Sequence, residues 1–283
     1  FDVIAGTMQR FIEEMALRWV RNCIRTTGVR RLAVAGGLFM NVKLNQKMLE
    51  LPEVESLYVM PSCGDESTPF GACWWGAQSL GCDTQTIQPL RGLSLGPTYD
   101  HAAIAQASQD AQHGGHVTAS EPASIADAVA DLLAKGEIVA WYQGREEFGA
   151  RALGHRSILA NPSVPGVVHR LNKAIKSRDF WMPFAGSMTR EQALAVLDNP
   201  KRHEAPYMLM TFPVRDHLGD FLAATHPYDQ TIRPQIVEES WNPEYHRVLT
   251  RFEACSGKRG GVLNTSFNLH GFPIVSSPAD AVD

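Results

Sequence analysis

The sequence predicts an α/β protein made of two units, and three features of the chain lead to that prediction. Stretches with the apolar spacing of helices alternate with short apolar runs typical of buried strands, which is the pattern of layered α/β domains. A segment over residues 83–97, rich in Thr, Gln, Pro and Gly, interrupts this alternation and shows little periodicity. The chain has 283 residues, which is enough for about two domains of average size.

The first unit, residues 1–82, begins with a predicted helix over residues 8–27, because apolar side chains recur there at helical spacing and Gly28 ends the pattern. The apolar run over residues 31–35 predicts a short buried strand that ends at a pair of glycines. The remaining elements expected in this unit are a helix over residues 41–51 that stops at Pro52, a strand over residues 57–60, and a helix from its N-cap Ser67 to about residue 80.

The second unit, residues 98–283, starts after the interruption. A helix is expected over residues 124–135, where the pattern is again apolar at helical spacing and Gly136 closes it. The strands expected in this unit cover residues 138–142, 207–214 and 261–264. Residues 279–283 resemble the first turn of a helix and the chain does not begin with Met, so we expect it to be an excerpt of a longer polypeptide.

Composition and charge exclude several classes of protein. Hydrophobic residues make up 44% of the chain and charged residues 20%, which excludes a disordered or collagen-like chain. The 26 basic and 30 acidic side chains give a net charge of −4, the wrong sign for a protein that binds nucleic acid along its phosphate backbone. The longest apolar stretch, residues 32–40, is far shorter than the roughly 18 residues of a membrane span. Neither a nucleic acid nor a membrane is therefore expected as a partner.

The cysteines indicate the compartment. There are 5 of them, an odd number without a C-x-x-C pair, which argues against a disulfide framework and against a cysteine zinc site. Unpaired thiols are typical of a reducing compartment. No basic and apolar leader begins at Phe1. A cytoplasmic location is therefore expected.

The densest group of chemically active residues lies in residues 143–157, directly after the first strand predicted in the second unit. Arg145, Arg151 and Arg156 lie there among glycines, and Ser157 ends the segment. An arginine guanidinium is a planar fork of donors that matches phosphate and carboxylate oxygens. Glycines between such forks let an anion approach the backbone. An ordinary exposed loop is the other interpretation, but the repetition of Gly and Arg favours an anion-binding segment.

A second cationic group lies in residues 171–179 and contains Lys173, Lys176 and Arg178. Lys173 and Lys176 are three residues apart on a predicted helix, so we expect them on one face. The other interpretation is an exposed amphipathic helix. We expect that replacing Arg151 or Lys176 weakens anion binding and leaves the melting temperature nearly unchanged, as is typical of ligand contacts.

A third polar group lies at the end of the last predicted strand. Asn264, Ser266 and Asn268 carry hydrogen-bonding side chains there. Such groups suit adenine, ribose or phosphate oxygens, although an ordinary turn uses the same residue types. Three polar groups at strand ends within one unit indicate a nucleotide cleft.

Two features of the first unit are also candidates for binding a ligand. Gly36 and Gly37 end a strand just before a helix, where glycine lets a phosphate approach and the helix N-terminus offers unpaired N–H groups. A tight turn is the alternative. Asp65 lies in a loop that leads into a helix, where a carboxylate either caps the helix or binds a cation.

Together these segments resemble the O-carbamoyltransferase family that contains the nodulation and antibiotic carbamoyltransferases. The resemblance covers nearly the whole chain, and residues 144–157 and 264–268 match most specifically. The matching segments are residues 35–37 with Asn41, 63–66, 143–157, 172–178, 183–185, 225–235 and 264–268.

The resemblance implies a two-domain enzyme. Residues 1–82 would be the C-terminal part of an actin-like (ribonuclease-H-like) domain, residues 83–97 a linker, and residues 98–283 a YrdC-like α/β domain. The YrdC-like domain is implied to form carbamoyladenylate from carbamoyl phosphate and ATP, with Mg²⁺ on the triphosphate. The actin-like domain would then transfer the carbamoyl group to a hydroxyl of a sugar, a nodulation factor or an antibiotic-like acceptor. The resemblance also allows a homodimer.

The same resemblance assigns roles to individual residues. Arg151 and Lys176 would be catalytic and contact carbamoyl phosphate or the adenylate. Asp65 matches an aspartate that holds Fe²⁺ together with two histidines; we expect these upstream of this chain, so the iron site is incomplete here. The residues implied to bind substrate or ATP are Gly36, Gly37, Asn41, Arg145, Arg156, Ser157, Arg178, Arg233, Asn264, Ser266 and Asn268.

The chain departs from the family pattern at several positions, and Met182 in the place of an arginine bears most on function. This departure motivates one alternative, a nucleotide-binding module without activity. A second alternative is a tRNA- or RNA-associated carbamoyl-AMP enzyme, because YrdC-like domains also occur in tRNA modification, although the negative net charge argues against it. Because half of the acceptor domain is expected upstream, we predict that residues 1–283 alone carbamoylate no acceptor.

Overall fold

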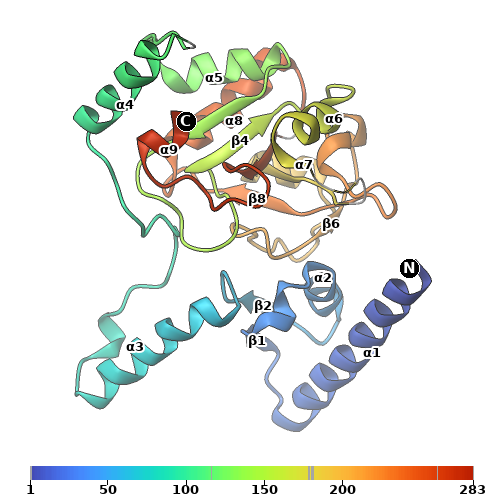
Figure 1. The fold of residues 1–283 in the computed structure, drawn as a ribbon. Coiled ribbons are helices and arrows are strands. Elements are labelled where there is room, and N and C mark those ends of the chain that lie inside the picture. The colour runs from blue at the N-terminus through green and yellow to red at the C-terminus, as the bar shows by residue number, and fades with distance from the viewer. Residues whose placement is uncertain (1, 116, 178, 180–181, 260, 283) are drawn as a thin grey trace.

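The structure, a computed structural model, describes residues 2–115, 117–177, 179, 182–259 and 261–282 (Figure 1). It confirms the α/β class, because helices pack on a mixed sheet of five strands. An N-terminal segment with a smaller, parallel pair of strands lies beside the part that contains this sheet (Figure 1). The actin-like and YrdC-like folds and the limits of the two domains stay predictions. Within the described residues, no helix has both the length and the apolar character that crossing a membrane requires.

The N-terminal elements are α1 (Asp2–Thr27), β1 (Arg31–Val34), α2 (Val42–Glu50), β2 (Ser56–Val59) and α3 (Thr68–Ser79). All five were predicted, and α1 begins earlier than expected. In the parallel pair, Leu32 of β1 lies opposite Leu57 of β2. Ser67 precedes α3, but its hydroxyl donates to the carbonyls of Pro61 and Ser62 and accepts nothing from the helix. The prediction that Ser67 caps α3 is therefore wrong.

The strands of the main sheet are β3 (Val139–Tyr142), β4 (Arg156–Ala160), β5 (Ala185–Thr189), β8 (Pro234–Val237) and β9 (Val262–Ser266). Their order is β3-β4-β9-β5-β8, and only the pair β5–β8 is parallel. Asn264 of β9 lies opposite Leu159 of β4 and Ala185 of β5, so it is at the centre of the sheet. A separate antiparallel pair joins β6 (Phe212–Pro213) and β7 (Thr231–Ile232).

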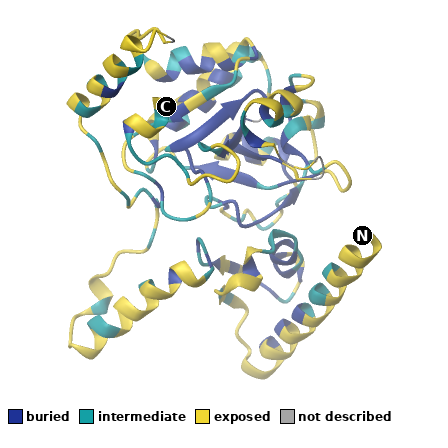
Figure 2. Ribbon diagram, viewed as in Figure 1, coloured by how far each residue is buried: buried dark blue, intermediate teal, exposed yellow. Residues whose placement is uncertain are grey.

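The helices around this sheet are α4 (His101–His113), α5 (Ile125–Ala134), α6 (Val167–Leu171), α7 (Arg190–Val196), α8 (Pro243–Ser256) and α9 (Pro278–Val282). Successive side chains of a strand point to opposite faces of its sheet. Leu159 of β4 accordingly packs with Phe252 in the core under α5 and α8, whereas Ile158 packs with Leu171 under α6. β4 is therefore buried on both faces (Figure 2).

Several elements were not predicted, and β4 is the most consequential. No strand was predicted within residues 143–157, but Arg156 and Ser157 begin β4 and are fully buried. A buried charged side chain normally needs hydrogen-bond partners, and residue type alone does not show whether distant segments supply them. The helix α8 was missed although Asn242 caps it and Pro243 opens it. The elements α4, α7 and β5 were also missed.

The N-terminal segment packs against the part that contains the main sheet through α2. Leu44 of α2 and Phe212 of β6 belong to the same hydrophobic cluster. The Lys201 ammonium donates three hydrogen bonds, at 2.5–2.7 Å, to carbonyls at and beyond the C-terminal end of α2. The residues that accept them are Leu49, Leu51 and Val54. A cation at this position is favourable because the carbonyls of a helix C-terminus are unpaired.

Candidate active site

Four polar side chains from three segments line one small cavity at the carboxyl end of β9. Arg151 comes from the loop before β4, Arg233 precedes β8, and Asn264 and Ser266 belong to β9. The cavity has a volume of about 30 Å³, which is room for about two water molecules. The structure thus brings the Gly/Arg segment and the polar group of the last predicted strand to one place.

Arg151 has a guanidinium that no described residue pairs with. We find no hydrogen bond or ion pair between this side chain and the described residues, and its buried Nε has no acceptor. Burial lowers the pKa of Arg151, and the nearby Cys63 thiol acts in the opposite direction. A half-buried cation with a buried donor that has no acceptor suits an anionic ligand.

Asn264 offers the opposite kind of atom to the same cavity. Its side chain is 1% exposed, and its amide nitrogen donates to the carbonyl of Ala152 at 3.2 Å and to Ser187 Oγ at 2.9 Å. Its Oδ1 has no donor. Because buried amide oxygens are normally paired, this oxygen is in place to accept an N–H group from a ligand.

Lys176 lies beside this cavity but is buried, with 2% exposure. Its Nζ donates to the carbonyl and side-chain oxygens of both Ser266 and Asn268, at 2.5–3.1 Å. The ammonium therefore ties the end of β9 to the turn that follows α6. The expectation that Lys176 can be replaced without loss of stability does not agree with these contacts, because removing it leaves buried acceptors unpaired.

The prediction that Lys173 and Lys176 share one face is wrong. The segment Asn172–Lys176 is a π turn, closed by the Ser177 N–H on the Asn172 carbonyl at 2.9 Å. Donor and acceptor are five residues apart in such a turn, so the spacing of side chains differs from that of an α-helix. Lys173 is exposed as a result, while Lys176 points into the protein.

An apolar cavity of about 230 Å³ adjoins Asn268. Its walls include Ile158 of β4, Ile175 of the π turn and Phe267 after β9. An apolar cavity with a polar group at its edge suits a flat ring such as a nucleobase. Asn268 lines this apolar cavity and Ser266 lines the smaller polar one, so Lys176, which donates to both, connects the two cavities.

The other arginines of the Gly/Arg segment lie apart from the small cavity. Arg156 is fully buried, donates to the carbonyl of Gln143 at 2.9 Å, and lies 3.6 Å from the centre of the Tyr142 ring. Ser157 is buried and accepts a backbone N–H at 3.1 Å. Arg145 is exposed and donates to a backbone carbonyl at 3.0 Å. These side chains hold the shape of the loop, and none of them lines the cavity around Arg151.

The residues predicted to bind ligand in the first unit also lie away from this cavity. Gly36 has a φ of 104°, in the left-handed region that favours glycine, and Gly37 begins the short 3₁₀ turn Gly37–Met40. Asn41 caps α2 by accepting the N–H of Leu44 at 3.0 Å. No member of the cavity around Arg151 comes from this segment.

The predicted metal residue Asp65 lies in an exposed turn before α3. Within the part of the chain that the structure describes, no three His, Cys, Asp or Glu side chains gather into a group that could hold a metal ion. The residues present therefore do not by themselves fit an iron site. Arg178 lies outside the described residues, and Met182 is 39% exposed.

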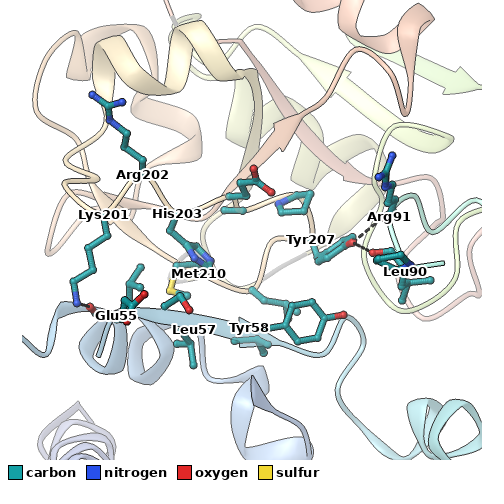
Figure 3. Close-up of a pocket in the computed structure, with 18 of the residues that line it drawn as sticks. Glu55, Leu57, Tyr58, Leu90, Arg91, Lys201, Arg202, His203, Tyr207 and Met210 are labelled. Atoms are coloured by element: carbon teal, nitrogen blue, oxygen red, sulfur yellow. Dashed lines mark hydrogen bonds between the residues drawn. The ribbon is translucent and has the colours of Figure 1, made fainter. Parts of the chain in front are cut away.

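A larger cavity, of about 520 Å³, lies between β2 and residues 201–207 (Figure 3). Tyr58 lies on one side of it, and His203 and Tyr207 lie on the other (Figure 3). Burial lowers the pKa of His203 to about 4 and raises the pKa of Tyr207 to about 12, so both are neutral near pH 7. The Tyr207 hydroxyl donates to the Arg91 carbonyl at 2.6 Å. This cavity was not predicted from the sequence, because its walls come from segments that are distant along the chain.

Two polar residues that shape the loop before β4 were not singled out from the sequence. Glu147 is 5% exposed and accepts three backbone N–H groups of that loop. Asn242 donates to the Gly154 carbonyl at 3.2 Å and also caps α8. An acidic residue inside a Gly/Arg segment and an Asn directly before a Pro are the signals that could have found them.

The structure defines an α/β protein with a small cavity, lined by Arg151 and Arg233, at the carboxyl end of a central strand. Residues 2–74 match the family model described as the carbamoyltransferase N-terminus, and residues 130–283 match the carbamoyltransferase C-terminus. The chain belongs to the carbamoyltransferase family. The resemblance stated from the sequence is confirmed.

Three curated relatives illustrate this similarity. An uncharacterized protein of Methanocaldococcus jannaschii is 35% identical over 98% of this chain and 45% of its own length. The nodulation protein NolNO of Sinorhizobium fredii is 34% identical, over 99% of this chain and 41% of its own. A 3'-hydroxymethylcephem-O-carbamoyltransferase of Amycolatopsis lactamdurans is 32% identical, over 89% of this chain and 45% of its own length. The chain therefore spans about half the length of the curated relatives it matches.

Proposed function

We propose that this site forms carbamoyladenylate from carbamoyl phosphate and ATP, as part of a protein that transfers the carbamoyl group to a hydroxyl of a small molecule. One observation carries the proposal: a buried donor without an acceptor, Arg151 Nε, and a buried acceptor without a donor, Asn264 Oδ1, belong to residues that line the same cavity. Membership of the carbamoyltransferase family supports it.

Carbamoyl phosphate has the groups that these two atoms lack. Its phosphate oxygens are acceptors for a guanidinium, and its amide N–H groups are donors for an amide oxygen. Arg233 lines the same cavity and adds a second cation. The cavity is smaller than the ligand, so binding requires its walls to move. Met208 in that wall has a φ of 57°, a strained conformation of the kind that is common at functional sites.

The apolar cavity beside Asn268 is the place we propose for the adenine ring of ATP. The triphosphate would then extend past Ser266 toward Arg151 and Arg233, where fixed positive charge stabilises the charge that develops in the reaction. Mg²⁺ would be held mainly by phosphate oxygens and water. Lys176 holds Ser266 and Asn268 in place. One water is consumed, and pyrophosphate and inorganic phosphate are released with the carbamoyladenylate.

The acceptor is proposed from the relatives. The name of the Amycolatopsis lactamdurans protein states a hydroxymethyl acceptor, and a hydroxyl is the group we propose for this protein. We derive no step through iron, because the described residues do not fit an iron site.

The test is pyrophosphate release by the full chain. Wild type is expected to release pyrophosphate only when carbamoyl phosphate and ATP are both present, and Arg151→Ala is expected to lose most of this activity. Arg18→Ala is the matched control, because Arg18 is an exposed arginine of α1 and lies outside the cavity. Absence of pyrophosphate release together with absence of carbamoyl phosphate binding would refute the proposal.

A further inference from the structure

Glu147 is a buried acid in the middle of the loop between β3 and β4. Its Oε1 accepts the backbone N–H groups of Leu153 at 2.7 Å, His155 at 3.3 Å and Arg156 at 3.2 Å. The side chain is 5% exposed. One oxygen thus fixes three amides on the returning half of the loop, which is the half that follows Arg151.

The backbone after Arg151 is fixed from both sides. The carbonyl of Ala152 accepts from Asn264 at 3.2 Å, and the carbonyl of Leu153 accepts from Gln235 at 2.8 Å. The N–H of Leu153 donates to Glu147. The hydrogen bond from Glu147 therefore acts two residues from Arg151, between the loop and the centre of the sheet.

No polar contact with the described residues sets the orientation of the Arg151 guanidinium. It makes no hydrogen bond or ion pair with the described residues, and its Nε is buried and unpaired. A guanidinium that is not tied by its own donors takes its position from the backbone that carries it. Glu147 holds that backbone on its amide side, while Asn264 and Gln235 hold its carbonyls.

We infer that Glu147 is a positioning residue, which holds Arg151 in the orientation that binds the anionic substrate by accepting the N–H groups of the loop. This inference rests on the proposed function, since it assigns the substrate contact to Arg151. Glu147 itself does not line the cavity around Arg151. A purely structural role for Glu147 would predict a loss of stability without a specific link to Arg151.

A double-mutant cycle separates the two roles. Binding of carbamoyl phosphate to the full chain is measured by ³¹P NMR titration for wild type, Arg151→Ala, Glu147→Ala and the double variant. Arg151→Ala is expected to weaken binding about 10- to 100-fold, the effect of losing one charge-assisted contact. Glu147→Ala is expected to weaken binding at least about 10-fold in wild type, yet less than about 2-fold when Arg151 is already absent.

Three further variants keep the test decisive if Glu147→Ala folds poorly. Glu147→Asp keeps the charge but withdraws the oxygens by one methylene group, so we expect the same coupling to Arg151. Glu147→Gln keeps an acceptor oxygen at the same reach and is expected to bind within about 3-fold of wild type. Gln192→Ala is the control, since Gln192 is equally buried and caps α7 but does not line the cavity. It should lower stability without coupling to Arg151.

The outcomes are distinguishable. If wild type binds carbamoyl phosphate but Glu147 and Arg151 contribute independently, or if Glu147→Asp and Glu147→Ala bind like wild type, the positioning role is refuted and the proposed function stands. If wild type does not bind carbamoyl phosphate, the proposed function fails and the positioning role fails with it.

Discussion

Replacing Lys176 tests whether its buried ammonium holds the end of β9. Its Nζ lies 2.5–3.1 Å from four oxygens of Ser266 and Asn268, and the residue is 2% exposed. An acceptor left unpaired in the interior costs about 1–3 kcal/mol, so we expect Lys176→Ala to lower the free energy of unfolding by about 3–5 kcal/mol. For a chain of this size, about 2–3 °C are lost per kcal/mol, which gives a fall in melting temperature of about 6–15 °C.

Thermal and urea unfolding of the full chain measure this effect. Lys173→Ala is the matched control, because Lys173 lies in the same π turn and is exposed; its melting temperature should stay within about 1–2 °C of wild type. Lys176→Met keeps a stem of similar length but no donor, so it should be nearly as unstable as Lys176→Ala. A Lys176→Met variant as stable as wild type would show that the stem, and not the ammonium, is what matters, and would refute the reasoning.

Three further predictions follow from other parts of the structure. Arg151→Ala should leave the melting temperature nearly unchanged, since the described residues make no hydrogen bond or ion pair with its side chain; a large fall in a thermal melt would contradict this. Gly261→Ala should lower the free energy of unfolding by about 3 kcal/mol or more. The φ of Gly261 is 85°, and a Cβ there would lie 1.9 Å from the Ser187 carbonyl oxygen. Gly219→Ala is the control in the same urea titration, because a Cβ at Gly219 meets open space and should change stability little. The free energy of unfolding should fall by about 2–3 kcal/mol as the pH decreases from about 6.5 towards 4. His203 is neutral in the folded state in this range, because burial lowers its pKa to about 4, and it takes up a proton on unfolding. His203→Gln should make this pH dependence shallower, and an unchanged slope would be evidence against a buried neutral His203.

The sequence by itself determined the features that depend on neighbours along the chain. Helices α1, α2 and α5 were predicted from apolar spacing and from the residues that end them, Gly28, Pro52 and Gly136. The Gly and Arg of residues 143–157 indicated an anion-binding segment, and the motifs indicated the family. Spacing and local hydrogen bonds are fixed within a few residues, so they can be inferred without the tertiary structure.

The tertiary structure alone decided which of the candidate residues can reach a ligand. Arg151 and Arg156 look alike in the sequence. Arg156 donates to a backbone carbonyl and lies over the ring of Tyr142, whereas Arg151 lines a cavity. Lys173 and Lys176 also look alike in the sequence, but Lys173 is exposed and Lys176 is buried. The partner of Lys176, Ser266, lies about 90 residues further along the chain. Burial and the pairing of polar atoms depend on such distant segments, and for that reason residue type and spacing could place these side chains near the site but could not assign their roles.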